Sequence, residues 1–214
     1  DQYQDSPFLK YFNIQKDKMS FDSDGFGIGF ETELNNLVWE PLIDYREQSE
    51  NHILYSPFLS DAEKNKLEKL KTYFDTNTSP RGYFLISSSG SSTSGRDSLK
   101  VYAILKSNFM NSAQKVNEKF NLATDMAWGS VLPSYHVGGM SVLARAYLTK
   151  AQVYFSSWKS FSYDWLVKNH IQLLSLVPTQ LFDLVQNKMK CPPQMKYVFV
   201  GGAHLSSELE KSVR

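Results

Sequence analysis

The chain has little of what several protein classes require. Cys191 is the single cysteine among 214 residues, so an intramolecular disulfide is impossible and a cytoplasmic location is expected. No apolar run approaches the length of a membrane span, and no secretory leader is visible. The first residue is Asp1, which fits a removed leader as well as a trimmed fragment.

Charge of one sign is also lacking. Lysine and arginine number 23 against 22 aspartates and glutamates, a net charge of +1, so there is no basic excess for nucleic acid or an anionic membrane surface. Small molecules are therefore the expected partners, and a homo-oligomer remains open. With 42% hydrophobic and 14% aromatic residues, the chain predicts a soluble globular protein of one large or two small domains.

The most distinctive stretch, residues 84–101, reads FLISSSGSSTSGRDSLKV. An apolar strand gives way to small and hydroxyl residues, whose backbone N–H groups and hydroxyls can bind phosphate, with Lys100 adding charge. The loop residues assigned to nucleotide binding are Ser89, Gly90, Ser91, Ser92, Thr93, Ser94 and Gly95. A flexible Gly/Ser-rich linker is the competing interpretation.

A Walker-type phosphate loop is disfavoured for two reasons. Arg96 and Asp97 stand where that motif needs Lys and Ser/Thr. The apolar run after the loop, residues 101–105, predicts a strand and not the helix that a Walker loop requires.

Hydrophobic periodicity predicts alternating strands and helices over most of the chain. Ser60 and Glu63 form a capping box that opens one helix, and Pro178 opens another. Strands are expected over 82–87, 101–105, 151–155, 171–177 and 196–200, the last of them buried, and further helices over 107–121, 141–149, 163–169 and from 207. This rhythm predicts an α/β fold, a mainly parallel sheet with flanking helices, with ligands at the carboxyl ends of the strands.

Three blocks of the chain resemble the adenylate-forming superfamily of acyl-CoA synthetases, luciferases and peptide-synthetase adenylation domains. The loop SSSGSSTSGRDSLK is similar to the family's T-S-G-[ST]-T-G-x-P-K, although the Pro-Lys pair is missing and Lys100 matches only if the extra residues are looped out. LKSNFMNSA followed by VLPSYHVGGMSVLAR is similar to N-x-x-x-S-A and L-P-L-F-H-V-G-G-L, and LVPTQL with VFVGGAHLS to V-P-T-x-L and G-G-A-x-L-S. The blocks cover residues 82–214, the α/β part of the family's N-terminal domain, and leave 1–81 as a poorly matched segment packed on the same domain.

The resemblance implies an acid–CoA ligase, which uses Mg-ATP to convert a carboxylate to an acyl adenylate and then transfers the acyl group to CoA. HVGGMSVLAR most resembles the o-succinylbenzoate–CoA ligases of menaquinone biosynthesis. His136 is then the candidate catalytic residue, with an orienting or gating role beside the acyl group. Gly138, Gly139 and Arg145 would bind the acid, Arg145 through a second carboxylate, and Gly201, Gly202 and Ala203 would approach the nucleotide.

Two other functions remain open: an adenylation domain that loads an amino or aryl acid onto a carrier protein, and a catalytically dead relative that binds nucleotide or acyl group. The family's later blocks and its C-terminal domain are absent before Arg214. We therefore expect the 214 residues alone to be an inactive N-terminal part of the ligase. No histidine, cysteine or acidic cluster predicts a protein-bound metal.

Overall fold

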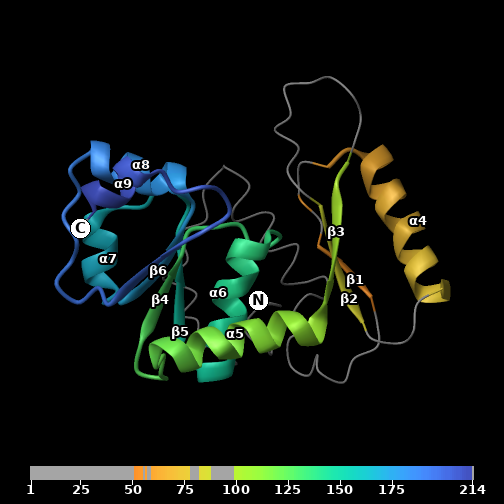
Figure 1. Ribbon diagram of the computed structural model, residues 1–214, viewed down its shortest axis with the longest axis horizontal. Helices are drawn as coiled ribbons and strands as arrows, with labels where there is room; N and C mark the ends of the chain where they lie inside the picture. The colour runs from red at the N-terminus through yellow and green to blue at the C-terminus, as the bar shows by residue number, and fades with distance from the viewer. Residues whose placement is uncertain (1–50, 55, 57–58, 78–81, 88–98, 214) are drawn as a thin grey trace, which may run out of the picture.

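The computed structural model describes residues 51–54, 56, 59–77, 82–87 and 99–213. The phosphate-loop candidates Ser89 to Gly95 lie outside the described residues. So do residues 1–50, the larger part of the predicted 1–81 segment. The described chain contains two β-sheets with helices between and around them (Figure 1).

The smaller sheet has the order β1-β2-β3, with β1 parallel and β3 antiparallel to β2. Helix α4 lies along this sheet (Figure 1), and Leu67 of the helix is fully buried in one apolar cluster with Ile53 and Leu85. The predicted capping box is present, since the backbone N–H of Ser60 donates to the Glu63 carboxylate at 2.8 Å. The elements are β1 (His52–Leu54), α4 (Asp61–Asn77), β2 (Tyr83–Ser87) and β3 (Val101–Leu105).

The larger sheet has the order β5-β4-β6-β7, and all its strand pairs are parallel. Helices α5 and α6 lie between the two sheets, whereas α7, α8 and α9 gather on the far side of the larger sheet (Figure 1). The elements are α5 (Lys106–Phe120), β4 (Ala127–Ser130), α6 (Val137–Thr149), β5 (Gln152–Phe155), α7 (Tyr163–Lys168), β6 (Leu173–Leu176), α8 (Pro178–Gln186), β7 (Tyr197–Val200) and α9 (Ser207–Ser212).

The main apolar core joins the two sheets through α5 and α6. Phe84 of β2 and Trp128 of β4 are both fully buried in it, together with Leu143 of α6. The Trp128 ring stacks on Phe199 of β7 with centroids 5.5 Å apart. Burial of such aromatic side chains stabilises the arrangement by roughly 2 to 3 kcal/mol each, so the two sheets are held as one body.

The predicted α/β class, with a mainly parallel sheet and flanking helices, is confirmed, and a strand follows the serine-rich stretch as the argument against a Walker loop requires. Three details differ. The strands divide into two sheets, and in the smaller one β3 pairs antiparallel with β2. Strand β7 is not buried as predicted, since it pairs with β6 alone among the described strands and leaves Val198 41% exposed. Helix α6 begins at Val137, four residues before the predicted Ser141.

Among the described residues, no helix combines the length and the apolar character that crossing a membrane requires.

Candidate functional site

A cavity of about 740 Å³ opens at the carboxyl ends of β6 and β7. One wall comes from the smaller sheet, through Ile86 and Tyr102, and the opposite wall from residues that end β6 and β7. This is the edge at which parallel α/β sheets bind ligands. The described lining comprises Ile86, Ser87, Tyr102, Leu132, Pro133, His136, Val137, Gly138, Gly139, Ser141, Arg145, Ser175, Leu176, Val177, Gln180, Phe199, Val200, Gly201 and Gly202.

The first turn of α6 points its N-terminus at the cavity. His136 is the N-cap residue, with extended backbone and no side-chain hydrogen bond to the helix N–H groups. Val137 and Gly138 follow at the cavity wall. The unsatisfied N–H groups and the positive end of the helix dipole favour an anion here by about 0.3 to 1 kcal/mol.

The His136 imidazole is half-buried on this wall. Its ring lies 4.6 Å from the Tyr135 ring, and burial lowers the pKa of His136 below its ordinary 6.5. The histidine is therefore neutral at pH 7, with one ring nitrogen able to donate and the other able to accept. A neutral ring can orient a polar group of a ligand without repelling or attracting its charge.

The three glycines at positions 139, 201 and 202 differ in what a side chain would meet there. A Cβ on Gly139 would lie 2.2 Å from the carbonyl oxygen of Pro133, so close backbone packing excludes any side chain there. Gly202 has φ = +87°, a conformation that favours glycine. A Cβ on Gly201 would have no atom within 4 Å, so its missing side chain leaves space in the cavity and serves no packing need among the described residues.

Arg145 is the charged residue of the described lining, which contains no aspartate or glutamate. Its guanidinium carbon lies 5.1 Å from the Phe199 ring centroid and 5.8 Å from that of Trp128. Burial lowers the pKa of Arg145, yet an arginine stays protonated. The buried Nε has no hydrogen-bond partner among the described residues, and no described carboxylate pairs with the side chain. A cation on aromatic rings, with no described carboxylate partner, gives this cavity a charge that is complementary to an anionic ligand.

Ser175 is a site residue that the sequence analysis missed. It lies on β6 in the cavity lining, is 6% exposed, and its buried Oγ finds no hydrogen-bond partner among the described residues. Its register partner on β7 is Phe199, the ring under Arg145. An unpaired buried hydroxyl costs about 1 to 3 kcal/mol, so Ser175 marks a place where a ligand atom or a bound water completes the polar contacts.

The structure brings all four predicted acid-binding residues together: His136, Gly138, Gly139 and Arg145 line one cavity, and Gly201 and Gly202 line it too. Ala203 is exposed and is not in the described lining, and neither is the exposed Lys100. The roles assigned to all these residues stay predictions. No group of three or more histidine, cysteine, aspartate or glutamate side chains that could hold a metal ion occurs among the described residues.

Known proteins resemble this chain in sequence and in fold. No protein-family profile matches the chain. The 2-succinylbenzoate–CoA ligase of Staphylococcus aureus strain MSSA476 is 35% identical over 104 residues, which are 48% of this chain and 21% of that enzyme. The ligase of strain MRSA252 is 34% identical over the same share. The matched stretch thus spans about a fifth of the length of these curated relatives.

The fold has solved counterparts in the same group. The o-succinylbenzoate coenzyme A synthetase of Bacillus subtilis, in complex with the acyl-adenylate intermediate, aligns with a TM-score of 0.51 at 20% identity, over 60% of this chain and 26% of that one. The same enzyme with ATP and magnesium ion aligns with a TM-score of 0.50 at 22% identity, over 60% and 27%.

The chain resembles the adenylate-forming superfamily, and within it the 2-succinylbenzoate–CoA ligases. Its α/β fold is that of the N-terminal domain of these enzymes. The relatives carry the name of a ligase, and the solved neighbours bind an acyl adenylate or ATP with magnesium.

Proposed function

We propose that the protein carrying this sequence is an ATP-dependent acid–CoA ligase, and that its acid is o-succinylbenzoate. The observation that carries the proposal is Arg145, a half-buried cation in an apolar cavity without a described carboxylate partner. An aromatic acid with two carboxylates has one to react and one for Arg145 to hold. The sequence similarity to 2-succinylbenzoate–CoA ligases supports the same acid.

In the proposed reaction, one substrate carboxylate oxygen attacks the α-phosphorus of Mg-ATP. The bond between the α-phosphorus and the bridging oxygen breaks, and pyrophosphate leaves with that bonding pair. The CoA sulfur then attacks the acyl carbonyl, loses its proton and expels AMP. ATP and CoA are substrates here, and Mg²⁺ enters the proposed reaction as Mg-ATP.

The cavity residues contribute position and fixed charge. Arg145 fixes the second carboxylate through charge-assisted hydrogen bonds, and the Ser175 hydroxyl donates to a substrate oxygen beside it. Neutral His136 and the first turn of α6 also line the cavity, where they would orient the reacting carboxylate. Residues 89–95 are proposed to bind the departing phosphates together with Lys100, and Gly201, Gly202 and Ala203 to approach the nucleotide.

The test is acyl-AMP formation by the intact protein, detected by mass spectrometry, with o-succinylbenzoate and with benzoate, which lacks the second carboxylate. We expect efficient turnover of the diacid alone. Arg145→Gln should lower kcat/KM for the diacid by about 100-fold, the order expected for a lost charged hydrogen bond, with ATP affinity unchanged. Lys150→Gln, which removes an exposed cation just after the same helix, is the control and should have no effect.

Three results would count against the proposal. Equal activity with mono- and diacids would remove the role of Arg145, and acyl-AMP formation followed by transfer to a carrier protein, but not to CoA, would favour the adenylation-domain alternative. Absence of ATP binding by the intact wild-type protein would indicate a catalytically dead relative of the ligases.

For the 214 residues alone we propose no ligase activity, because the matched stretch spans about a fifth of the length of the related ligases. ATP–pyrophosphate exchange by the chain alone would contradict that.

A further inference from the structure

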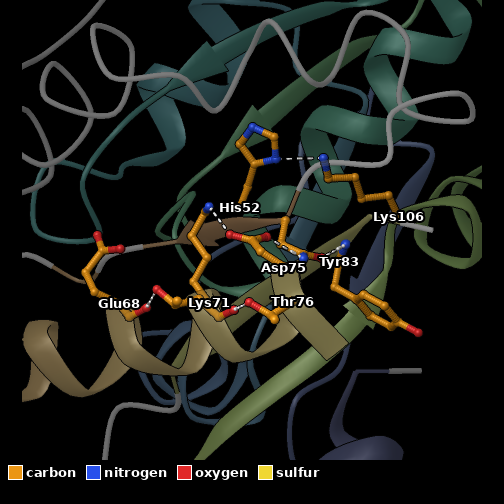
Figure 2. Close-up of polar contacts among 9 residues, drawn as sticks. His52, Glu68, Lys71, Asp75, Thr76, Tyr83 and Lys106 are labelled. Atoms are coloured by element: carbon orange, nitrogen blue, oxygen red, sulfur yellow. Dashed lines mark hydrogen bonds and ion pairs between the residues drawn. The ribbon is translucent and has the colours of Figure 1, made fainter. Parts of the chain in front are cut away.

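The buried face of α5 carries two polar side chains, Lys106 and Asn117, among apolar residues of the main core. The two lie about three helical turns apart and therefore on the same side of the helix. Each of them links α5 to another element. The Nζ of Lys106 lies 2.6 Å from Nδ1 of His52 on β1 (Figure 2). The Nδ2 of Asn117 donates a hydrogen bond to the backbone carbonyl oxygen of Arg145 in α6 at 2.9 Å.

The side-chain amide of Asn117 is only half satisfied. Asn117 is 7% exposed, and its Oδ1 is buried without a hydrogen-bond partner in the described part of the chain. Asn51, which is 5% exposed, differs: it donates to Asp75 at 2.7 Å and accepts from the Tyr83 N–H at 2.9 Å (Figure 2). An unsatisfied buried oxygen lowers stability, so an apolar residue would suit position 117 better for stability alone. A buried asparagine between packed helices can instead fix their register.

The acceptor of the Asn117 hydrogen bond is the residue whose side chain lines the cavity. The Arg145 carbonyl oxygen also accepts from Oγ1 of Thr149 at 3.1 Å, a bond within α6, so Asn117 is not required to satisfy it. What Asn117 adds is a link to α5, on which α6 packs. A helix advances about 1.5 Å and turns about 100° per residue, so a small slip of α6 moves the guanidinium away from the Phe199 ring.

We propose that Asn117 is a positioning residue for Arg145. Its amide holds α6 in the register that places the guanidinium on the Phe199 ring at the cavity wall. The effect on substrate rests on the proposed function, whereas the position of Arg145 is measurable without any substrate. Asn117 thus contributes to recognition of the acid although it does not line the cavity.

The kinetic test is Asn117→Leu in the intact protein. Leucine has a similar size and removes both the donor and the unsatisfied oxygen. We expect KM for the diacid to rise about tenfold with kcat unchanged, within the loss that a displacement of about 1 Å can cause. KM for ATP should stay within a factor of two, and the urea unfolding midpoint should not fall. An unchanged KM for the diacid, or equal increases in both KM values with a lower urea midpoint, would overturn the proposal.

Gln194→Leu is the matched control. Gln194 also donates from its side-chain amide to a helix carbonyl, that of Leu166 in α7 at 3.1 Å, on the other side of the larger sheet (Figure 1). Its loss should leave KM for the diacid and for ATP unchanged. An increase in KM for the diacid as large as in Asn117→Leu would show that any lost side-chain bond to a helix has this effect, and would refute the role of Asn117.

Crystal structures of the intact wild type and the same two variants test the positioning directly. The guanidinium carbon of Arg145 should move by about 1 Å or more in Asn117→Leu and stay within about 0.5 Å in Gln194→Leu. An unmoved guanidinium in Asn117→Leu would overturn the proposal. A wild type that does not activate the diacid would refute the proposed function and leave this comparison valid. If Asn117→Leu does not fold, Asn117→Ser replaces it with the same expected results, because a serine hydroxyl bonds back to its own helix and does not reach α6.

Discussion

The guanidinium carbon of Arg145 lies 5.1 Å from the ring centroid of Phe199, and the ring stacks in turn on Trp128. Arg145 comes from α6 and Phe199 from the last described strand of the larger sheet, so the contact joins two elements that meet only in the folded protein. The aromatic face supports the cation without neutralising it. The charge therefore remains available to a ligand in the cavity.

The first prediction concerns this aromatic support. Phe199→Leu removes the ring face under the guanidinium but keeps an apolar side chain, and we expect KM for the acid to rise about 3- to 30-fold, since a desolvated cation–π contact contributes about 0.7 to 2 kcal/mol. KM for ATP should stay within a factor of two. Steady-state kinetics of the intact protein, assayed for the proposed ligase activity, measure both.

Phe109→Leu is the matched control for that variant. Phe109 is buried in the same core cluster and packs on Phe84, and no cation–π contact links it to Arg145. It should lower the free energy of unfolding as Phe199→Leu does and leave both KM values unchanged. A similar rise in acid KM in the two variants would show that general core packing, and not support of Arg145, sets the affinity.

The second prediction separates stability from binding at Ser175. Ser175→Ala removes a buried hydroxyl that has no described partner, so the free energy of unfolding should stay the same or rise by about 1 kcal/mol. Affinity for the acid should fall about fivefold or more, because the bound substrate loses a donor. Urea unfolding and acid titration measure the two quantities.

Ser162→Ala shows what loss of a structurally engaged serine looks like. Ser162 caps α7 and its Oγ accepts from the Trp165 N–H at 3.1 Å, so its removal should cost about 1 kcal/mol of stability and leave acid binding intact. If Ser175→Ala also loses stability without losing affinity, its hydroxyl has a structural partner and the ligand role is wrong.

Local patterns in the sequence were sufficient to predict the local structure. The Ser60–Glu63 capping box and Pro178 at the start of α8 act over three or four residues, and both are present as expected. The alternation of strands and helices follows from periodicity, which is also a local property. The last helix begins at Ser207 as expected, and its cap is the preceding residue Ser206, whose Oγ accepts from the Leu209 N–H.

Features that depend on distant partners could not be read in the same way. The division into two sheets depends on which strands pair with one another. The exposure of β7 depends on its having β6 as its one neighbour among the described strands. Ser175 is one hydroxyl in an apolar run, and only the folded structure reveals that it has no hydrogen-bond partner among the described residues. His52 and Lys106 are 54 positions apart in sequence, so no spacing signals their contact. Arg145 was identified through a motif, but its aromatic support was not.

The third prediction contrasts two glycines at the cavity. Gly139→Ala places a Cβ 2.2 Å from the Pro133 carbonyl oxygen, so the backbone must move, and we expect a loss of about 3 kcal/mol of stability. Helix propensity alone predicts a gain of about 1 kcal/mol for the same change, so even the sign is informative. Urea unfolding gives the answer.

Gly201→Ala is the paired variant. Its Cβ meets no atom within 4 Å, so stability should change by less than about 0.5 kcal/mol, whereas the methyl group enters the cavity and should weaken nucleotide or acid binding. Equal stability losses in the two variants would mean that the backbone around Gly139 yields more easily than its contact distance indicates.

The fourth prediction is a pH dependence set by His136. Burial lowers the pKa of this histidine in the folded protein, whereas the unfolded chain titrates near 6.5. Below about pH 6.5 the unfolded state therefore takes up the proton first, and the free energy of unfolding should fall with pH until the lower folded pKa is passed. His136→Gln does not titrate there and should have a flatter stability curve between pH 7.5 and 5.5.

In the intact protein, His136→Ala should impair use of the acid more than binding of ATP, because the ring lies on the cavity wall beside the first turn of α6. Equal losses for acid and ATP would contradict the placement of His136 at the acyl group. A stability curve as steep as that of the wild type in His136→Gln would assign the pH dependence to another group.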